Sequence, residues 1–170
     1  MEKKFVIAIY VDNQFGVLMR VASLFTRRGF NIDSLTSGIT EDPRYSRITI
    51  TMHGDEYAQA QVINQLKKLV NVKKVEVLED ESIERELMLI KVKHTSGTRT
   101  EIMTAVDVFR AKVIDYSPSE MSIEVTGDPS KMDAFVALMR PFGISEMCRT
   151  GIVALDRGGM TLLNKNKKGL

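Results

Sequence analysis

The chain contains the same order of sequence patterns twice, and this repeat limits the possible folds more than any other feature. In the first half, apolar or alternating runs typical of strands enclose two stretches with apolar residues at helical spacing. We expect strands at 5–11, 31–40, 46–52 and 72–78, and helices whose apolar residues fall within 17–25 and 62–70. The resulting order, β-α-β-β-α-β, is that of the ferredoxin-like unit.

The second half repeats this order. We expect strands at 87–93, 111–117, 121–126 and 144–155, and helices over 102–109 and 129–139. Gly54-Asp55 and Gly127-Asp128 occupy equivalent places, and each aspartate is a candidate N-cap for the helix that follows. The repeat therefore predicts an α+β chain of two tandem ferredoxin-like domains.

Charge and apolar patterning suggest the domain limits. The stretch EDESIERE at 79–86 is charged and polar, and the end of the chain is polar and basic. We expect a first domain over 1–79, a linker over 80–86, a second domain over 87–160 and a frayed tail over 161–170. Domains this small have marginal cores and open sheet edges, which favours an oligomer, with a compact monomer as the open alternative.

Composition narrows the class of protein. The net charge is only +2, there is no apolar run near 18 residues, and the start lacks the long apolar stretch of a secretory signal. The single cysteine excludes an internal disulfide and a cysteine-rich zinc site. We therefore expect a cytoplasmic chain that binds neither membranes nor nucleic acid.

The sequence offers no catalytic group. His53 and His94 have no metal-ligating neighbours at suitable spacing and are interpreted as solvated or loop histidines. Cys148 falls in an expected strand without a neighbouring base and is interpreted as a small core residue. The nucleophile-elbow, dinucleotide-binding and Walker motifs are all missing. We expect no catalytic residue and no metal site, as in a binding or regulatory chain.

The loop at 12–16 is the most informative segment, because it leads a strand directly into a helix. The first N–H groups of a helix have no intrahelical partner and favour an anion such as a carboxylate. Gly16 allows close approach to the backbone, while the amides of Asn13 and Asn31 both donate and accept hydrogen bonds. These groups suit a small zwitterion. From the residues alone, the favoured alternative is that Asn13 and Gly16 only shape a turn and a cap.

Several segments resemble the regulatory (small) subunit of acetolactate synthase, also called acetohydroxyacid synthase, with its N-terminal ACT domain. They are NQFGVL at 13–18, RRGFNIDSL at 27–35, FRAKVID at 109–115 and RTG at 149–151, and the likeness runs from about residue 5 to 157. In that family the ACT domains pair across a dimer, and a branched-chain amino acid, usually valine, binds at the junction. The resemblance implies a homodimer of this kind.

The resemblance also implies the effector site. It would take Asn13 and the backbone at Gly16, Val17 and Leu18 from one chain, and Asn31 and Ile32 from the other. One position departs from the family pattern: residue 15 is commonly Pro, Ser or Ala, and here it is Phe15. This departure leaves open whether the effector is valine, leucine or isoleucine.

The resemblance implies a partner as well. The catalytic (large) subunit would carry thiamine diphosphate, Mg²⁺ and FAD, and this chain would bind none of them. The small subunit would raise the activity of its partner and make it sensitive to feedback by the effector.

Two other functions are alternatives for this sequence. RNA-recognition modules share the element order, but their strands present aromatic residues, and the strands SRITITM and MSIEVTG have none, which argues against RNA binding. A free-standing amino-acid sensor that acts on another enzyme or on transcription stays open.

Overall fold

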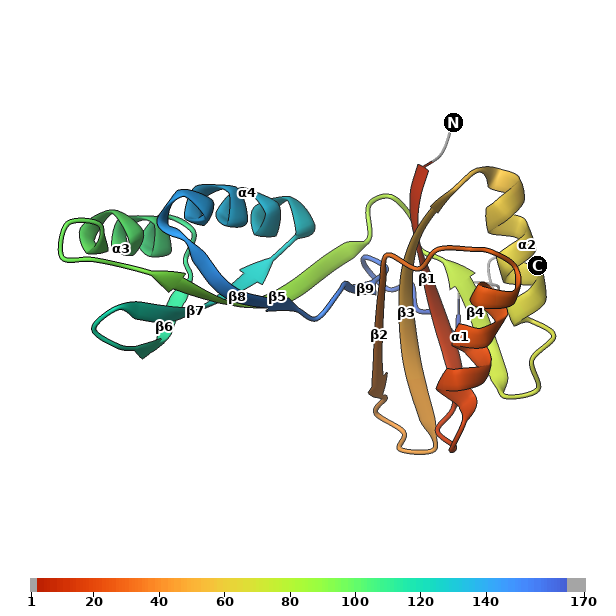
Figure 1. Cartoon of the computed structure of the whole chain (residues 1–170). Coiled ribbons are helices and arrows are strands. Elements are labelled where there is room, and N and C mark those ends of the chain that lie inside the picture. The colour runs from red at the N-terminus through yellow and green to blue at the C-terminus, as the bar shows by residue number, and fades with distance from the viewer. Residues whose placement is uncertain (1–2, 165–170) are drawn as a thin grey trace. The chain divides into compact units, whose positions relative to one another are not determined.

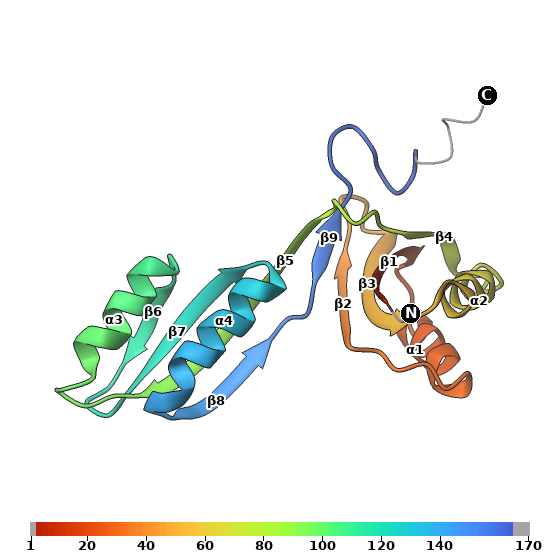
Figure 2. The ribbon, with the colours of Figure 1, turned by 90° about the horizontal axis from the view of Figure 1, so that it is seen from above.

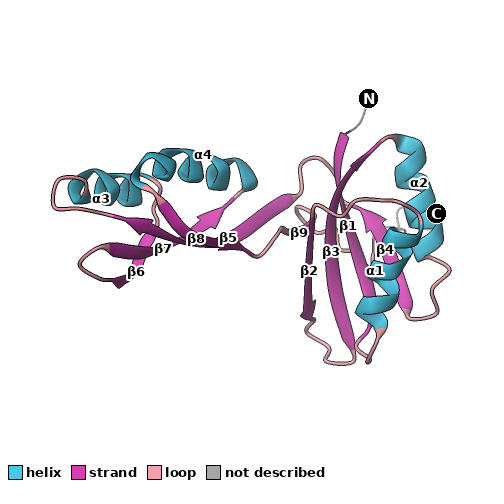
Figure 3. Cartoon of the chain, viewed as in Figure 1, coloured by secondary structure: helices cyan, strands magenta, loops and turns pink. Residues whose placement is uncertain are grey.

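The computed structural model describes residues 3–164 of the chain. They form two compact units, one of residues 3–83 with 152–164 and one of residues 84–151. Each unit has an antiparallel sheet with two helices on one face (Figure 1, Figure 3). No helix among the described residues is long and apolar enough to cross a membrane.

The first unit confirms the predicted element order. Its elements are β1 (Lys3–Asp12), α1 (Val17–Arg27), β2 (Ser34–Ile39), β3 (Tyr45–Gly54), α2 (Glu56–Leu66) and β4 (Val72–Val77). The strands lie in the order β2-β3-β1-β4, so β2 and β4 are the edges of this sheet.

The core of the first unit lies between the sheet and its two helices. The strands contribute residues such as Ile7 and Ile50, and the helices contribute residues such as Phe25 and Leu66, all fully buried. The side chain of Asp55 accepts a hydrogen bond from the Ala58 amide at 2.8 Å, which confirms the predicted N-cap of α2.

The second unit repeats this arrangement. Its elements are β5 (Ile83–Lys93), α3 (Arg99–Val108), β6 (Lys112–Tyr116), β7 (Glu120–Gly127), α4 (Pro129–Met139), a 3₁₀ turn (Arg140–Phe142) and β8 (Ile144–Arg149). The strand order is β6-β7-β5-β8. Asp128 caps α4 by accepting a hydrogen bond from the Lys131 amide at 2.9 Å, as predicted. The structure is therefore α+β, with the β-α-β-β-α-β order twice.

The end of the chain differs from the expectation. The single strand expected at 144–155 is two strands, β8 and a short β9 (Val153–Leu155), and the break includes Gly151 with a left-handed φ of 81°. Residues 152–164 belong to the first unit rather than to a second domain that reaches residue 160. Leu162 is 5% exposed, so the expected frayed tail does not begin at 161; residues 165–170 lie outside the described residues.

The reason lies in the second face of the first sheet. Residues 5–11 are apolar throughout, so Val6 and Ala8 point away from the helices and need a cover of their own. Ile152, Ala154 and Leu162 provide it and form one buried cluster with them. Figure 2 shows β9 on the side of the first sheet opposite α1 and α2.

The expected linker at 80–86 is also too long. Strand β5 begins at Ile83, and Glu86 is only 7% exposed. Charged residues in this stretch therefore belong to folded structure.

Candidate functional site

Helix α1 begins without a cap. Gly16 stands at its N-cap position with a left-handed φ of 81°, no side chain caps the helix, and its first turn has no acidic residue. Within the described residues, the backbone N–H groups of Gly16, Leu18 and Met19 have no hydrogen-bond partner. These groups and the helix dipole leave a place for an anion at this end.

Two of the other three α-helices of residues 3–164 have a side chain that caps their start. Asp55 and Asp128 cap α2 and α4. The start of α3, which occupies the place of α1 in the second unit, has no side-chain cap either, and its N-cap residue is Thr98 with a φ of −101°. The feature that separates α1 from the other described α-helices is therefore the left-handed Gly16 at its N-cap position.

Asn13 already has a structural role. Its Nδ2 donates to the Pro43 carbonyl at 2.9 Å, and its Oδ1 accepts from Ser46 Oγ at 3.1 Å. These bonds hold the turn between β2 and β3 against the loop at 12–16. Asp42 and Arg44 stabilise the same turn, and the hydrogen bond from the Arg44 side chain lowers the pKa of the Asp42 carboxyl. One N–H and one lone pair of the Asn13 amide remain for a ligand.

Asn31 and Ile32 lie beyond the other end of α1. The helix has 11 residues, which corresponds to about 16 Å, so a single chain does not bring them to Gly16. The Asn31 side chain is exposed and donates from Nδ2 to Asp33 Oδ1 at 3.1 Å, while Ile32 packs against the first core. The six expected site residues thus form two groups at opposite ends of one helix.

Exposed apolar side chains surround the open start of α1. Phe15 is fully exposed, and Leu18 and Met19 are exposed on the first turn. Val17 is 4% exposed and faces the core, so only its backbone can contribute to a site.

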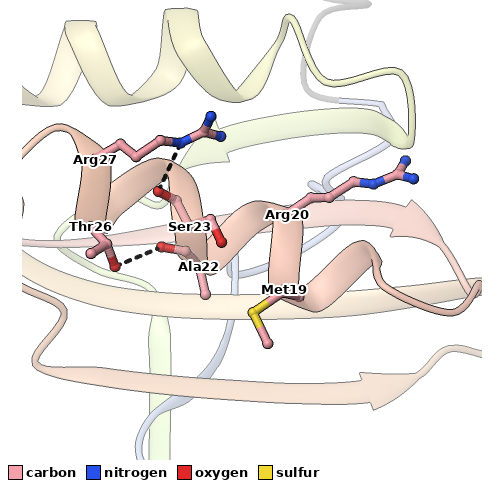
Figure 4. Close-up of a pocket in the computed structure, with 6 residues that line it drawn as sticks. All are labelled: Met19, Arg20, Ala22, Ser23, Thr26 and Arg27. Atoms are coloured by element: carbon pink, nitrogen blue, oxygen red, sulfur yellow. Dashed lines mark hydrogen bonds between the residues drawn. The ribbon is translucent and has the colours of Figure 1, made fainter.

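The outward face of α1 carries a shallow depression of ≈ 540 Å³. Figure 4 shows the side chains that line it, which are Met19, Arg20, Ala22, Ser23, Thr26 and Arg27. The small residues Ala22 and Ser23 lie at its centre, and Arg27 folds back to donate from Nε to the Ser23 carbonyl at 3.3 Å. This open face can accept a second helix at close range.

The structure corrects two of the residue interpretations. His94 lies in a loop as expected but is not solvated: it is 4% exposed, its Nε2 lies 2.8 Å from the Ser117 carbonyl oxygen, and its ring stacks on Tyr116. Cys148 is not a core residue: it is exposed, because it pairs with Leu89 on the face of the second sheet that the helices do not cover.

His53 is exposed as expected, but it has a partner that the sequence did not reveal. Its Nδ1 lies 2.6 Å from Asp33 Oδ2. The two residues are 20 positions apart, and only the pairing of β2 with β3 brings them together. To predict this contact from the sequence, the register in which β2 pairs with β3 would have to be known.

Two family models match the chain. A model described as "AHAS small subunit-like ACT domain" matches residues 7–74, and one described as "Small subunit of acetolactate synthase" matches residues 85–158. The two matches correspond to the two repeats of the element order.

Relatives match over nearly the whole chain. A "Probable acetolactate synthase small subunit" of Archaeoglobus fulgidus is 50% identical over 155 residues, which are 91% of this chain and 98% of the relative. An acetolactate synthase small subunit of Mycobacterium leprae is 48% identical over 153 residues, 89% of this chain and 90% of the relative. The crystal structure of the acetolactate synthase small subunit of Thermotoga maritima is similar, with a TM-score of 0.87 and 40% identity, and the match covers 93% of this chain and 99% of that chain.

Proposed function

Because this chain belongs to the family of acetolactate synthase small subunits, we propose that it is the feedback sensor of that enzyme. Catalytic activity belongs to the large subunit, and this chain is the regulatory subunit. In the proposal, a branched-chain amino acid binds at the start of α1, with valine first among valine, leucine and isoleucine. Binding lowers the activity of a large subunit that the chain otherwise activates.

The uncapped start of α1 carries this proposal. A carboxylate placed there accepts hydrogen bonds from free backbone N–H groups of Gly16, Leu18 and Met19. The helix dipole contributes about 0.3–1 kcal/mol to such an anion, and each charge-assisted hydrogen bond contributes about 1.5–3 kcal/mol. The exposed Phe15 and Leu18 supply apolar surface for a branched side chain.

A homodimer completes the site in this proposal. Strand β2 is an edge of the first sheet, and its residues 37–39 are exposed. Two-fold pairing of two copies along β2 sets their α1 helices antiparallel, so the start of one faces the end of the other. Asn31 and Ile32 of the second copy then reach the effector held at Gly16 of the first.

The cofactors belong to the partner in this proposal. The large subunit would hold thiamine diphosphate, Mg²⁺ and FAD, and the small subunit would act on it only through contact. The effector then changes the partner through a coupling free energy, typically about 1–3 kcal/mol, which corresponds to a 5–150-fold change in affinity.

Two variants of one residue test the effector site. A Cβ at Gly16 meets no atom within 4 Å, and Asn and Asp both tolerate a left-handed φ. Gly16→Asp places a negative charge where the effector carboxylate binds, and Gly16→Asn is the uncharged control of the same shape. In the reconstituted two-subunit enzyme, we expect Gly16→Asp to abolish inhibition by valine and Gly16→Asn to retain most of it, with activation intact in both. Full inhibition of the Gly16→Asp enzyme would contradict the site.

A further inference from the structure

We propose that Asp33 and His53 are positioning residues that make the effector site selective for a free ammonium group. They hold the Asn31 amide with its oxygen turned outward as a hydrogen-bond acceptor. The inference rests on the proposed function and adds to it the chemical class that the second half of the site recognises.

The three side chains form a continuous chain of contacts. Asn31 Nδ2 donates to Asp33 Oδ1 at 3.1 Å, and Asp33 Oδ2 lies 2.6 Å from His53 Nδ1. The Asp33 backbone amide donates to the Thr51 carbonyl at 2.9 Å, which anchors this residue to β3. Both carboxylate oxygens are therefore engaged, one by each neighbour, and the carboxylate cannot rotate without losing a contact.

The chemistry of the carboxylate determines which way the amide points. An ionised aspartate only accepts hydrogen bonds, so the NH₂ group of Asn31 must face Asp33. The Asn31 Oδ1 atom then points away from Asp33 on an exposed side chain. An outward carbonyl oxygen accepts a hydrogen bond from an ammonium group, and the nearby Asp33 charge adds attraction for a cation.

His53 keeps the carboxylate in place. Its Nδ1 lies 2.6 Å from Asp33 Oδ2, so a proton on Nδ1 makes His53 a donor to a carboxylate that can only accept. A side chain that donates one N–H group, such as glutamine, should replace it, and an apolar side chain should not.

The two halves of the site thus bind the two charged groups of a zwitterion. The start of α1 takes the carboxylate, and Asn31 with Asp33 behind it takes the ammonium group. The ligand class is the α-amino acid, in preference to the 2-oxo acid with the same side chain, which has the carboxylate but no ammonium group.

The test compares two ligands with the full chain. L-Valine and 3-methyl-2-oxobutanoate share a carboxylate and an isopropyl group, and their affinities are measured by ligand-induced shifts of the melting temperature. We expect Asp33→Asn to weaken valine binding about tenfold, the equivalent of one charge-assisted hydrogen bond, and to leave 2-oxo acid binding within about twofold. His53→Gln should retain valine affinity, and His53→Leu should reduce it.

Asp80→Asn is the matched control, because it removes the same charge from an exposed side chain of the first unit. It should change neither affinity. Unchanged valine affinity in Asp33→Asn, or an equal loss for both ligands, would overturn the inference and leave the proposed function standing. A wild-type chain that binds no branched-chain amino acid would overturn the proposed function and the inference together.

Discussion

At the scale of single residues, Phe15 is the side chain whose exposure is hardest to explain by the folded chain alone. It is fully exposed beside the left-handed Gly16, at the start of α1. An aromatic ring at this place gains burial only when a ligand or a second copy covers it. Its position next to the free N–H groups makes it part of the proposed effector site.

Phe15→Ala should therefore affect binding and not folding. We expect the free energy of unfolding to stay within about 0.5 kcal/mol of wild type, because the ring makes no buried contact. Valine affinity should fall several-fold, because apolar cover is lost, and the ratio of valine to isoleucine affinity should change. Titration calorimetry measures both, with Tyr57→Ala, at an exposed aromatic on α2, as control. Identical affinities in Phe15→Ala and wild type would exclude Phe15 from the site.

Arg149 joins two acidic residues of the second unit. It forms an ion pair with Glu86, whose side chain is 6% exposed, and a second one with Asp133, at 2.7 Å, whose side chain is 70% exposed. These hydrogen bonds raise the pKa of the guanidinium against the opposing effect of burial. The buried partner explains why a charged stretch of sequence can be part of a strand.

The two partners of Arg149 should differ in their importance for stability. Arg149→Met leaves the Glu86 carboxylate buried and unpaired, and we expect a loss of about 2 kcal/mol in the free energy of unfolding. Asp133→Asn removes only the exposed pair and should cost less than about 0.5 kcal/mol. Urea unfolding followed by circular dichroism gives both values. Equal losses in the two variants would contradict the assignment of the stabilising contact to Glu86.

At the scale of elements, α1 and α3 end in the same way with different residues. The Phe30 amide donates to the Phe25 carbonyl at 3.0 Å, and the Ala111 amide donates to the Val106 carbonyl at 2.8 Å. Both bonds close a Schellman motif, in which the residue before the donor is left-handed. That residue is Gly29 (φ 70°) after α1 but Arg110 (φ 50°) after α3.

Exchanging these residue types should change stability in opposite directions. Arg110→Gly removes a left-handed strain of about 1–2 kcal/mol but adds chain entropy to the unfolded state, so we expect a net gain of about 0.5–1 kcal/mol. Gly29→Ala should lose about 1 kcal/mol, since a Cβ there meets no atom and only the backbone is strained. Melting temperatures of the two variants check the signs. A lower melting temperature for Arg110→Gly would show that Arg110 is not strained.

Local patterns predicted the elements well because they depend on local causes. Apolar spacing located the strands and helices, except that Leu69 and Val70 lie past the end of α2 at Leu66. Asp55 and Asp128 marked two helix starts by their capping chemistry. Patterns failed where the cause is tertiary. The break at Gly151 and the burial of His94 depend on segments that pack only after folding.

Some features of the candidate site likewise follow from the local sequence, and others depend on tertiary contacts. The freedom of Gly16 and the open helix start follow from residues that are adjacent in sequence. Two contacts depend on how β2 and β3 pair: the hydrogen bond from Asn13 to the Pro43 carbonyl, and the contact between Asp33 and His53. Sequence reasoning could therefore nominate the site residues but not the bonds that orient them.

At the scale of the whole molecule, the C-terminal segment 152–164 acts as part of the first unit. The Ile152 amide donates to Ser34 Oγ at 3.5 Å on β2, and Arg47 Nη2 donates to the Ala154 carbonyl at 2.7 Å. Burial lowers the pKa of the Arg47 guanidinium. The segment that follows the second unit in the chain thus contacts the strand that begins next to Asp33.

Substitution of two adjacent leucines tests how much this segment contributes to the free energy of unfolding. Leu162 is 5% exposed in the cluster with Val6 and Ala8, and Leu163 is 55% exposed. We expect Leu162→Ala to lower the free energy of unfolding by about 2–4 kcal/mol through cavity formation, and Leu163→Ala to change it by less than about 0.5 kcal/mol. Urea unfolding of the full chain gives the comparison. Equal values would mean that the segment does not cover the sheet in solution.

In the proposed function, the open start of α1 binds a branched-chain amino acid by its carboxylate. Calorimetric titration of the purified chain with L-valine, L-leucine and L-isoleucine tests it most directly, with Gly16→Asp and Gly16→Asn titrated beside the wild type. We expect saturable binding of at least one of these amino acids, retained in Gly16→Asn and lost in Gly16→Asp. Absence of binding for all three, or equal binding by the Gly16→Asp chain, would contradict it.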